Sequence, residues 1–329
     1  MTEVLILSTA GSGVGYGHAI RMSALQKSFN DNGVECRHFI QCMSPQDNFK
    51  LDSAYSMDWL NNPNQIISLK GVAETVVIDS YECDYEYYKL LGEIFPLAVA
   101  VDDYNRLNYP VGLIINPNLY CDELDYSQQS AEVLGGAAYV ILRKLIKTSR
   151  IHYKLKKDVG AIMITLGGFD QQALLPSLIQ NLSNASAKLT VLAGSDEYAA
   201  DLRLKFSSEI EIKGLLNEAE MAEAYLNQDL VISAAGQTLN ELAYIGIPTI
   251  AICTGEDQRS NLNAFYKKGF IADLLDYNTV DFLNLIEDRI NYYQDYAARA
   301  SVHQLGRALI DGAGASRIFK KITEVELNV

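Results

Sequence analysis

Short runs of valine, isoleucine and leucine recur along the chain, and most are followed by glycine or polar residues and then by apolar residues at helical spacing. Continuous apolar runs are typical of strands that are buried on both faces of a parallel sheet. They form two series, at residues 4–7, 37–40, 76–78, 97–101 and 113–115 and at residues 162–166, 189–192, 210–212, 230–232 and 249–252. Each series opens with a strand and a glycine-rich turn. The sequence therefore predicts an α/β protein with two Rossmann-like domains, each built on a parallel sheet.

The boundary between the two domains is expected between Thr148 and Gly160, which gives an N-terminal domain at residues 1–150 and a C-terminal domain at residues 151–329. The tail from His303 to Thr323 has a helical pattern and fits either domain. Basic residues gather at the boundary, and they form either a solvated linker or a positive field that steers an anionic substrate. They are Arg143, Lys144, Lys147, Arg150, Lys154, Lys156 and Lys157.

The charge balance limits the class of partner. The 329 residues include 27 lysines and arginines against 41 aspartates and glutamates, which gives a net charge of −14. This balance disfavours nucleic acid as the main partner, because phosphate backbones need a large basic surface. A small anionic ligand fits the chain, since a few backbone N–H groups can hold a phosphate inside an acidic protein.

The sequence also indicates the compartment. No run of about 18 apolar residues is present, so no membrane span is expected. The N-terminus lacks the pattern of a signal peptide, because Glu3 interrupts its apolar start. The five cysteines are scattered and include no C-x-x-C pair, which is typical of reduced thiols. We therefore expect a cytoplasmic protein.

A glycine-rich stretch from Gly11 to Gly17 separates the first predicted strand from a helix expected at residues 18–32. Glycines at such a turn let backbone N–H groups approach a ligand, and the helix N-terminus favours negative charge. His18 lies at the start of this helix, where the helix dipole disfavours the imidazolium form. We expect a neutral His18 that acts as a general base, with a capping or core role as the alternative. His38 lies in a strand pattern and is expected to be structural.

Several common motifs are absent. Gly13, Gly15 and Gly17 do not have the G-x-G-x-x-G spacing, and no acidic residue ends the second predicted strand, so NAD is disfavoured. The chain has no Walker A loop, no G-x-S-x-G elbow and no histidine and carboxylate cluster at metal-ligand spacing. Asp102 and Asp103 end a strand, where adjacent side chains point in different directions. The sequence therefore predicts neither a cofactor nor a metal ion.

Loops of the second domain place small or polar residues at the carboxyl ends of predicted strands. The N–H groups around Ala235, Gly236 and Gln237 open a helix and are suited to a diphosphate. Glu241 lies about 1.5 turns after Gly236, so its carboxylate can reach vicinal ribose hydroxyls; the alternative is a glutamate that only interacts with the helix dipole. Two further loops of this kind carry Gly167, Gly168 and Asp170, and Asp257 and Gln258.

Glycine-rich loops of both domains are expected to point into one cleft, since open α/β sheets bind ligands at the carboxyl ends of their strands. A nucleotide-sugar held between the domains is the ligand that this arrangement predicts.

Motifs that occur in a fixed order from Val4 to the region of Phe270 resemble one enzyme family. They are Gly15-Tyr-Gly-His18-x-x-Arg21, Val77-Ile-Asp-Ser-Tyr81, Val101-Asp-Asp-Tyr104, Leu113-Ile-Ile-Asn116, Ala138-Tyr-Val-Ile-Leu-Arg143, Leu166-Gly-Gly-x-Asp170, Ser233-Ala-Ala-Gly236 with Glu241, and Asp257-Gln258. This set resembles the pseudaminic-acid-pathway UDP-sugar hydrolases, which act on UDP-2,4-diacetamido-2,4,6-trideoxy-β-L-altropyranose, and the related spore-coat polysaccharide proteins. The resemblance implies a GT-B fold, in which the parallel sheets of two Rossmann-like domains face a central cleft.

The resemblance also implies an activity, namely metal-independent hydrolysis that breaks the anomeric C–O bond with inversion and releases UDP. On this basis His18 activates the attacking water, while Tyr81 and Gln258 contact the sugar. Glu241 holds the ribose, and the amides around Gly236 bind the diphosphate. The other predicted substrate-binding residues are Gly15, Gly17, Arg21, Gly167, Gly168, Asp170, Ala235, Gln237 and Asp257.

Three hypotheses follow. The first is a hydrolase of a UDP-linked deoxy-acetamido sugar in nonulosonic acid or surface polysaccharide biosynthesis. The second is an inverting GT-B glycosyltransferase, in which His18 or a neighbouring carboxylate deprotonates an acceptor. The third is a sugar-nucleotide sensor without catalysis, which is disfavoured because His18 stands beside its glycines. The predicted partner is the UDP-sugar substrate, and the sequence leaves the oligomeric state open.

Overall fold

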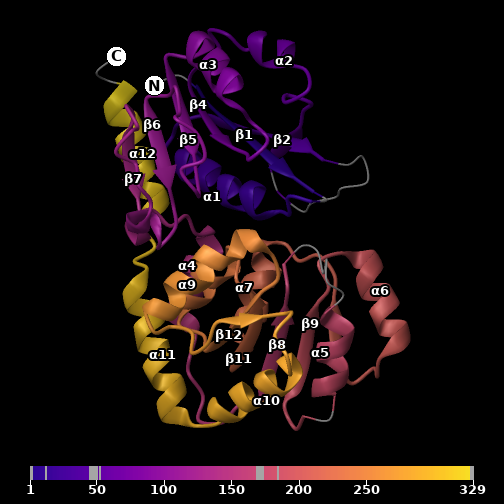
Figure 1. The fold of residues 1–329 in the computed structure, drawn as a ribbon. Coiled ribbons are helices and arrows are strands. Elements are labelled where there is room, and N and C mark those ends of the chain that lie inside the picture. Colours follow the sequence, from indigo (N-terminus) through magenta and orange to yellow (C-terminus); the bar gives the residue numbers. More distant parts are fainter. Residues whose placement is uncertain are drawn as a thin grey trace. The chain divides into compact units, whose positions relative to one another are not determined.

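The computed structural model describes residues 3–11, 13–43, 51, 53–167, 174–183 and 185–326. The chain divides into two compact units: unit 1 contains the residues up to Lys144 and those from Gly312 onward, and unit 2 is Leu145–Asp311. Each unit is an α/β structure with its own parallel sheet, as the sequence predicts (Figure 1). The expected common cleft stays a prediction.

Unit 1 is built on a seven-stranded sheet with the order β3-β2-β1-β4-β5-β6-β7, in which every neighbouring pair is parallel. The strands are β1 (Glu3–Ala10), β2 (Cys36–Cys42), β3 (Ala54–Ser56), β4 (Ala73–Asp79), β5 (Leu97–Val101), β6 (Leu113–Asn116) and β7 (Glu132–Gly135). Five of them match the predicted apolar runs. The other two, β3 and β7, lie at the edges of the sheet and carry partly exposed side chains, so they lack a continuous apolar run.

Helices cover both faces of this sheet. They are α1 (Gly17–Asp31), α2 (Asn64–Ile67), α3 (Tyr85–Ile94) and α12 (Gly314–Glu326), with the 3₁₀ helices η1 (Cys121–Glu123) and η2 (Ala137–Tyr139). Successive residues of a strand point to opposite faces. In β1, Val4 and Ile6 therefore pack in one apolar cluster with α1 and α12, and Leu5 and Leu7 pack in a second cluster with α3 and Trp59.

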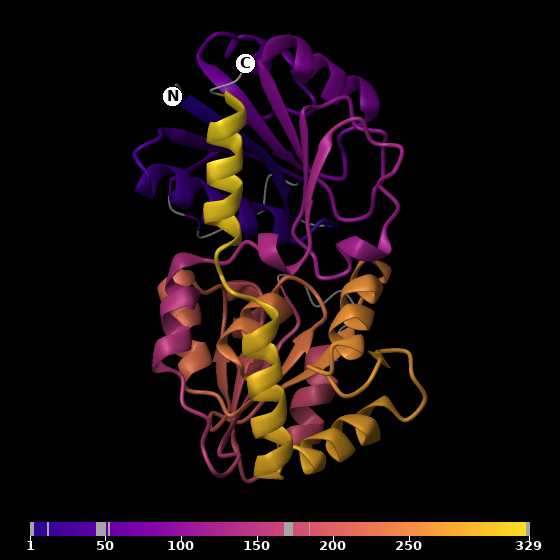
Figure 2. The same cartoon turned by 90° about the vertical axis from the view of Figure 1, so that its left-hand side faces the viewer.

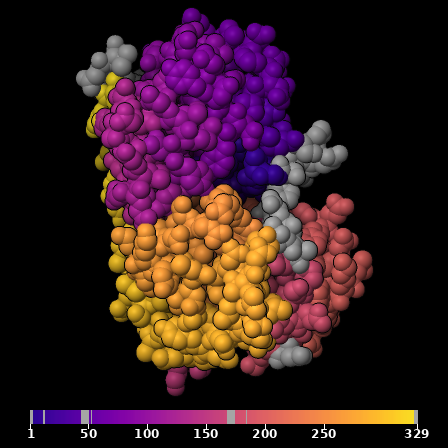
Figure 3. Space-filling model, viewed as in Figure 1, coloured from indigo at the N-terminus to yellow at the C-terminus, as the bar shows by residue number. Residues whose placement is uncertain are grey.

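The C-terminal segment differs from the predicted domain division. The residues from Gly312 onward belong to unit 1, so residues 151–329 do not form one unit. The reason is the apolar face of α12, where Ile318 and Ile322 are fully buried in the same cluster as Phe29 of α1. Figures 2 and 3 show α12, in yellow, along the side of unit 1.

Unit 2 is built on a six-stranded parallel sheet with the order β10-β9-β8-β11-β12-β13. Its strands are β8 (Ala161–Thr165), β9 (Lys188–Leu192), β10 (Glu211–Lys213), β11 (Leu230–Ala234), β12 (Thr249–Cys253) and β13 (Leu275–Asp276). Its helices are α4 (Lys144–His152), α5 (Leu174–Leu182), α6 (Asp196–Lys205), α7 (Glu218–Leu226), α8 (Thr238–Ile245), α9 (Arg259–Lys267), α10 (Phe282–Tyr292) and α11 (Tyr296–Leu309), with the 3₁₀ helix η3 (Glu256–Gln258). The sequence predicted all of these strands except the two-residue edge strand β13.

Each sheet has one point at which the strand order reverses, between β1 and β4 in unit 1 and between β8 and β11 in unit 2. The connections that leave two such strands run to opposite sides, which opens a crevice at their carboxyl ends. The glycine-rich stretch after β1 and the segment after β11 both begin at these switch points. The topology therefore places the predicted ligand-binding loops where open sheets bind ligands.

Part of the basic cluster at the predicted boundary has a structural role. The Arg150 guanidinium donates hydrogen bonds of 2.9–3.2 Å to three backbone carbonyl groups of unit 2. Lys144 lies 2.7 Å from Asp31, and Lys156 lies 3.1 Å from Asp229. These contacts give Arg150 a structural role, and substrate steering by the basic cluster stays a prediction.

Three further expectations concern His38, the cysteines and membrane-spanning helices. His38 is structural as predicted, because it is fully buried in β2 with Nε2 2.7 Å from Ser8 Oγ. Burial lowers the pKa of His38 to about 3, so this imidazole is neutral. The five cysteines are free. None of the helices in the described parts of the chain combines the length and apolar character that crossing a membrane requires.

Candidate active site

Polar side chains from four elements meet at the carboxyl edge of the unit 1 sheet. His18 and Arg21 lie in the first turns of α1, and Asp79 is the last residue of β4. Asp103 follows β5 by two residues, and Asn118 follows β6 by two residues. The site lies at the switch point between β1 and β4, which is where a ligand is expected in an open α/β sheet.

The glycine-rich stretch before α1 forms a tight loop with an open surface. Gly11 and Gly15 exchange two backbone hydrogen bonds of 2.8 and 2.9 Å. Gly13 and Gly15 have φ values of +86° and +73°, which favour glycine, and a Cβ at Gly13, Gly15 or Gly17 would meet no atom of the described residues within 4 Å. The N-cap residue of α1, Tyr16, makes no side-chain capping hydrogen bond in the described part of the chain. The loop thus has room for a ligand beside helix N–H groups, which attract negative charge.

His18 pairs with Asp79 through a hydrogen bond of 2.6 Å between Nδ1 and Oδ1, and both side chains are buried. Nη2 of Arg21 lies 3.3 Å from the same Nδ1, but its two hydrogens are taken by Asp79 Oδ1 and Asp103 Oδ2, at 2.7 and 2.9 Å. Nδ1 of His18 therefore carries a hydrogen and donates it to the carboxylate, which leaves the lone pair on Nε2. This tautomer is the one that a general base needs when its second nitrogen faces the reactant.

Arg21 joins two buried carboxylates. Its Nε and Nη2 donate to Asp79 at 2.6 and 2.7 Å, and its Nη1 and Nη2 donate to Asp103 at 2.9 Å each. Burial alone would raise the pKa of Asp79, but the charge and hydrogen bonds of Arg21, together with the hydrogen bond from His18, outweigh it and hold this pKa well below its usual range. The pKa of Asp103 is lowered in the same way, chiefly by Arg21. Both carboxyl groups are therefore ionised at neutral pH.

Tyr81 and Asn118 complete the surroundings of Asp103. The Tyr81 hydroxyl donates to Asp103 Oδ2, and Asn118 Nδ2 donates to Asp103 Oδ1 at 2.6 Å. The Tyr81 ring stands edge-on to the His18 ring, with 4.4 Å between their centroids. Burial and the Asp103 charge raise the pKa of Tyr81, so its hydroxyl stays protonated.

Two predicted substrate contacts thus have internal partners in unit 1. The polar groups of Arg21 and Tyr81 are bound to carboxylates, and Arg21 is only 5% exposed. Their direct contact with a substrate stays a prediction. The sequence analysis did not predict Asp79 and Asp103 as site residues. Both follow the carboxyl end of a predicted strand, and this position was the signal that could have identified them.

Asp102 and Asp103 point in different directions, as the sequence predicted. Asp102 accepts hydrogen bonds of 2.7 Å from the hydroxyls of Tyr109 and Tyr126, away from the partners of Asp103. Among the residues that the structure describes, no group of three histidine, cysteine, aspartate or glutamate side chains is placed to hold a metal ion.

In unit 2 the loop after β11 is tied to the loop after β12. Oε1 of Gln258 accepts hydrogen bonds from the N–H groups of Ala235 and Thr254, at 3.1 Å each. Asn261 Nδ2 donates to the carbonyl oxygens of Ala235 and Gly236, at 2.9 and 3.1 Å. Within the described ranges, a Cβ at Gly236 would meet no atom within 4 Å, and the N-cap residue Gln237 makes no side-chain capping hydrogen bond to α8. The backbone at the start of α8 is thus fixed in shape and open above Gly236, which suits an anion.

The remaining predicted residues of unit 2 lie around this segment. Glu241 is 3% exposed, and its Oε2 accepts a hydrogen bond of 3.1 Å from the hydroxyl of Tyr225. Gly167 has a φ of +88°, with no atom of the described residues within 4 Å of a Cβ built on it, and Asp257 is exposed in η3. Gly168 and Asp170 lie outside the described residues. The contacts of Gln258 are made to protein loops, and its contact with a sugar stays a prediction.

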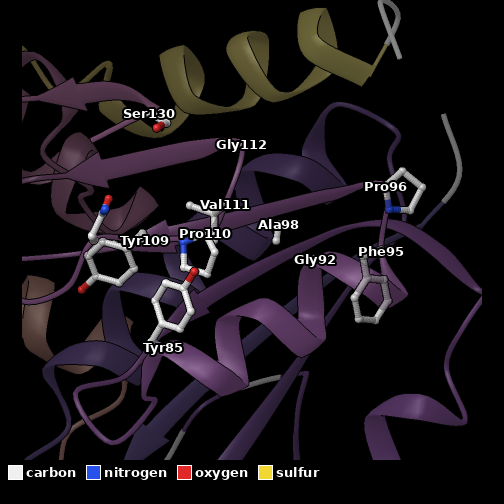
Figure 4. A pocket seen from close by; sticks show the side chains of 11 residues that line it. Tyr85, Gly92, Phe95, Pro96, Ala98, Tyr109, Pro110, Val111, Gly112 and Ser130 are labelled. Atoms are coloured by element: carbon white, nitrogen blue, oxygen red, sulfur yellow. The ribbon is translucent and has the colours of Figure 1, made fainter. Parts of the chain in front are cut away.

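A cavity of 330 Å³ lies elsewhere in unit 1, between α3 and the segment that leads into β6 (Figure 4). The rings of Tyr85, Phe95, Tyr109 and Pro110 line it. It contains none of the predicted site residues, and it has no ionisable group except the tyrosine hydroxyls. It is therefore separate from the candidate active site.

Comparisons with known proteins agree with this architecture. Residues 161–289, within unit 2, match the glycosyltransferase family 28 C-terminal domain. The spore coat polysaccharide biosynthesis protein SpsG of Bacillus subtilis is 26% identical over 198 residues, which cover 59% of this chain and 58% of that protein. The UDP-2,4-diacetamido-2,4,6-trideoxy-beta-L-altropyranose hydrolase of Campylobacter jejuni is 21% identical over 275 residues, which cover 82% of this chain and 97% of that protein.

The match to SpsG, and a second one to the protein MJ1062 of Methanocaldococcus jannaschii, each span 58% of the relative's length. Among solved structures, Acinetobacter baumannii MurG has a TM-score of 0.64 at 14% identity, with 98% of this chain and 100% of that chain covered. S. aureus MnaA in a co-structure with UDP has a TM-score of 0.65 at 13% identity, with 100% and 98% covered. The chain therefore has the two-domain fold of GT-B enzymes such as MurG and MnaA, and its second unit carries a region similar to the glycosyltransferase family 28 C-terminal domain.

Proposed function

We propose that the protein hydrolyses a UDP-linked deoxy-acetamido sugar, of the UDP-2,4-diacetamido-2,4,6-trideoxy-altrose type, to UDP and the free sugar. The observation that carries this proposal is the buried pair of His18 and Asp79 beside an open glycine loop at a switch point. The similarity to the Campylobacter jejuni hydrolase over 82% of the chain supports the substrate class. The similarity to SpsG, a spore coat polysaccharide biosynthesis protein, supports a place in surface polysaccharide biosynthesis.

In the proposed reaction, Nε2 of His18 takes a proton from a water molecule as the water oxygen attacks the anomeric carbon. The bond between that carbon and the diphosphate oxygen breaks, and its electron pair leaves with UDP. Attack from the face opposite UDP inverts the anomeric centre. The hydrogen bond from Nδ1 to Asp79 holds the ring in the reactive tautomer and stabilises the imidazolium as it forms.

Unit 2 would bind the UDP group. The backbone around Ala235, Gly236 and Gln237 would hold the diphosphate at the N-terminus of α8, whose dipole favours the negative charge of the departing group. Glu241, held by Tyr225, would accept hydrogen bonds from the ribose hydroxyls. Gly167 and Gln258 would contribute further contacts from the loops after β8 and β12.

An inverting glycosyltransferase is the second candidate, and the match to the family 28 C-terminal domain favours it. The same histidine would then deprotonate an acceptor hydroxyl in place of water. The third hypothesis, a sensor without catalysis, is disfavoured by the pairing of His18 with Asp79, which a ligand sensor does not need.

An acceptor-free assay separates hydrolysis from transfer. We expect the purified protein to release UDP from the UDP-linked deoxy-acetamido sugar in the presence of EDTA, because the proposed steps use only protein groups. NMR of the sugar product should show the inverted anomer first. Release of UDP that begins only when a sugar or lipid-linked acceptor is added would contradict hydrolysis and support the transferase.

The ribose role of Glu241 predicts a loss of UDP affinity. The Glu241→Ala variant should bind UDP about 10- to 100-fold more weakly by calorimetry, the range that corresponds to a lost hydrogen bond with a charged group. The matched control is Tyr225→Phe, which removes only the hydroxyl that holds Glu241 and keeps the carboxylate. Its affinity should fall much less. Equal UDP affinity for Glu241→Ala and the wild type would remove Glu241 from the ribose site.

A further inference from the structure

The groups around His18 carry an unbalanced charge when its imidazole is neutral. We define the imidazole cluster as His18, Arg21, Asp79, Tyr81 and Asp103. Arg21 contributes one positive charge and the two aspartates contribute two negative charges, so the cluster has a net charge of −1 with a neutral His18. It becomes neutral when His18 takes a proton.

This balance matters because the cluster is buried. Arg21, Asp79 and Asp103 are 5%, 0% and 4% exposed. Water screens their charges poorly, and an uncompensated buried charge is unfavourable. With Asp79 as its sole acidic neighbour, Arg21 would be fully neutralised, and an imidazolium would leave an excess positive charge. The second carboxylate, Asp103, removes that excess.

The tyrosine of the cluster and the titratable groups around it do not change this count. Tyr81, from the segment after β4, is a neutral donor because burial and Asp103 raise its pKa. Burial keeps His38 of β2 neutral by lowering its pKa to about 3. Tyr104 lies beside Tyr81, with 5.7 Å between ring centroids, and Tyr120 stacks on Tyr104 at 6.4 Å. Burial and the Asp103 charge raise the pKa of Tyr120, so its hydroxyl stays protonated.

We propose that Asp103 is a positioning residue that acts through Arg21 to make His18 a stronger base. Its charge balances the imidazolium that forms when His18 takes the proton, and its four hydrogen bonds from Arg21, Tyr81 and Asn118 fix the guanidinium against Asp79. The inference rests on the proposed role of His18 as general base. It adds a residue that neither touches the substrate in the proposed reaction nor contacts the imidazole by a hydrogen bond.

Asp102 provides a matched control. It is the neighbouring carboxylate and is also buried, at 2% exposed, but its hydrogen bonds come from Tyr109, Tyr126 and the backbone N–H groups of Asn105 and Arg106. The Asp102→Asn and Asp103→Asn variants therefore make the same chemical change one residue apart. Only the second removes charge from the imidazole cluster.

The test is NMR titration of the His18 ring in the substrate-free protein, with the signals assigned by a His18→Gln variant among the four histidines. We expect the wild type to show the Nδ1–H tautomer. The titration midpoint should fall by about one pH unit or more in Asp103→Asn, since a nearby opposite charge shifts such equilibria by this amount. It should stay at the wild-type value in Asp102→Asn. Equal midpoints in the wild type and Asp103→Asn would overturn the proposal.

A second variant keeps the test decisive if Asp103→Asn does not fold. Tyr81→Phe removes one hydrogen bond from Asp103 but keeps both the negative charge and the ring against His18. Its midpoint should equal or exceed that of the wild type, and a lower midpoint would contradict the charge balance. The titration needs no substrate, so it tests the role of Asp103 separately from the proposed activity. If the protein shows these midpoints but releases no UDP, the proposed function is wrong and the charge balance at His18 still holds.

Discussion

Replacing His18 with alanine should lower kcat for UDP release by about 10²- to 10⁴-fold, which is the contribution of a positioned general base. The affinity for UDP should change little, because the groups proposed to bind the nucleotide lie in unit 2. The physical reason is that His18 offers a lone pair on Nε2 to the water, while its hydrogen bond to Asp79 fixes the ring in place. Alanine removes both the base and this hydrogen bond.

The matched control is His152→Ala, which removes an exposed imidazole of α4 outside the site. Its kcat should equal that of the wild type. Added imidazole should restore part of the turnover of His18→Ala, since it supplies the missing base. A His18→Ala variant that keeps near-wild-type turnover would remove His18 from the mechanism.

Replacing Arg21 with methionine should lower the free energy of unfolding of unit 1 by about 3–5 kcal/mol at pH 7, because two buried carboxylates lose their shared cation. Trp59 is the single tryptophan of the chain and is fully buried in unit 1, so its fluorescence during urea unfolding reports this unit. The matched control is Lys89→Met, which breaks an exposed pair with Glu86 on α3 of the same unit and should change this free energy far less.

The pH dependence of this effect has a defined sign. In the wild type the pKa values of Asp79 and Asp103 are lower when folded than when unfolded, so their contribution is present above about pH 4 and is lost as the pH falls further. Without Arg21, the desolvation that already opposes ionisation should raise both pKa values, and protonation then relieves the repulsion. The difference between wild type and Arg21→Met should therefore shrink from pH 7 to pH 5. A difference that stays constant would show that the guanidinium acts by packing alone.

The parallel sheets could be predicted because their information is local. Residues such as Val4 to Leu7 alternate between two apolar clusters, so a strand buried on both faces appears in the sequence as an unbroken apolar run. The edge strands β3, β7 and β13 lack that signal, because they are only two to four residues long and carry partly exposed side chains. The glycines at Gly13 and Gly15 were also predictable as a turn, and their positive φ values explain the residue type.

The partners of His18 could not be read in the same way. Asp79 and Asp103 lie 58 and 82 residues from Arg21, and they meet it only because β4 and β5 are placed next to β1 in that order. A motif search finds each aspartate at a strand end but does not say which carboxylates share one guanidinium. The alternating direction of side chains did distinguish Asp102 from Asp103.

The sequence by itself determined the fold class, the two open-sheet units, the position of the glycine loops and the placement of His18 at the start of α1, because these follow from hydrophobic periodicity and local backbone sterics. The tertiary structure decided that α12 packs on unit 1 and that two carboxylates, one guanidinium and one imidazole form a single buried cluster. The physical reason is that burial and charge pairing depend on contacts between residues far apart in the chain, which the order of the strands creates.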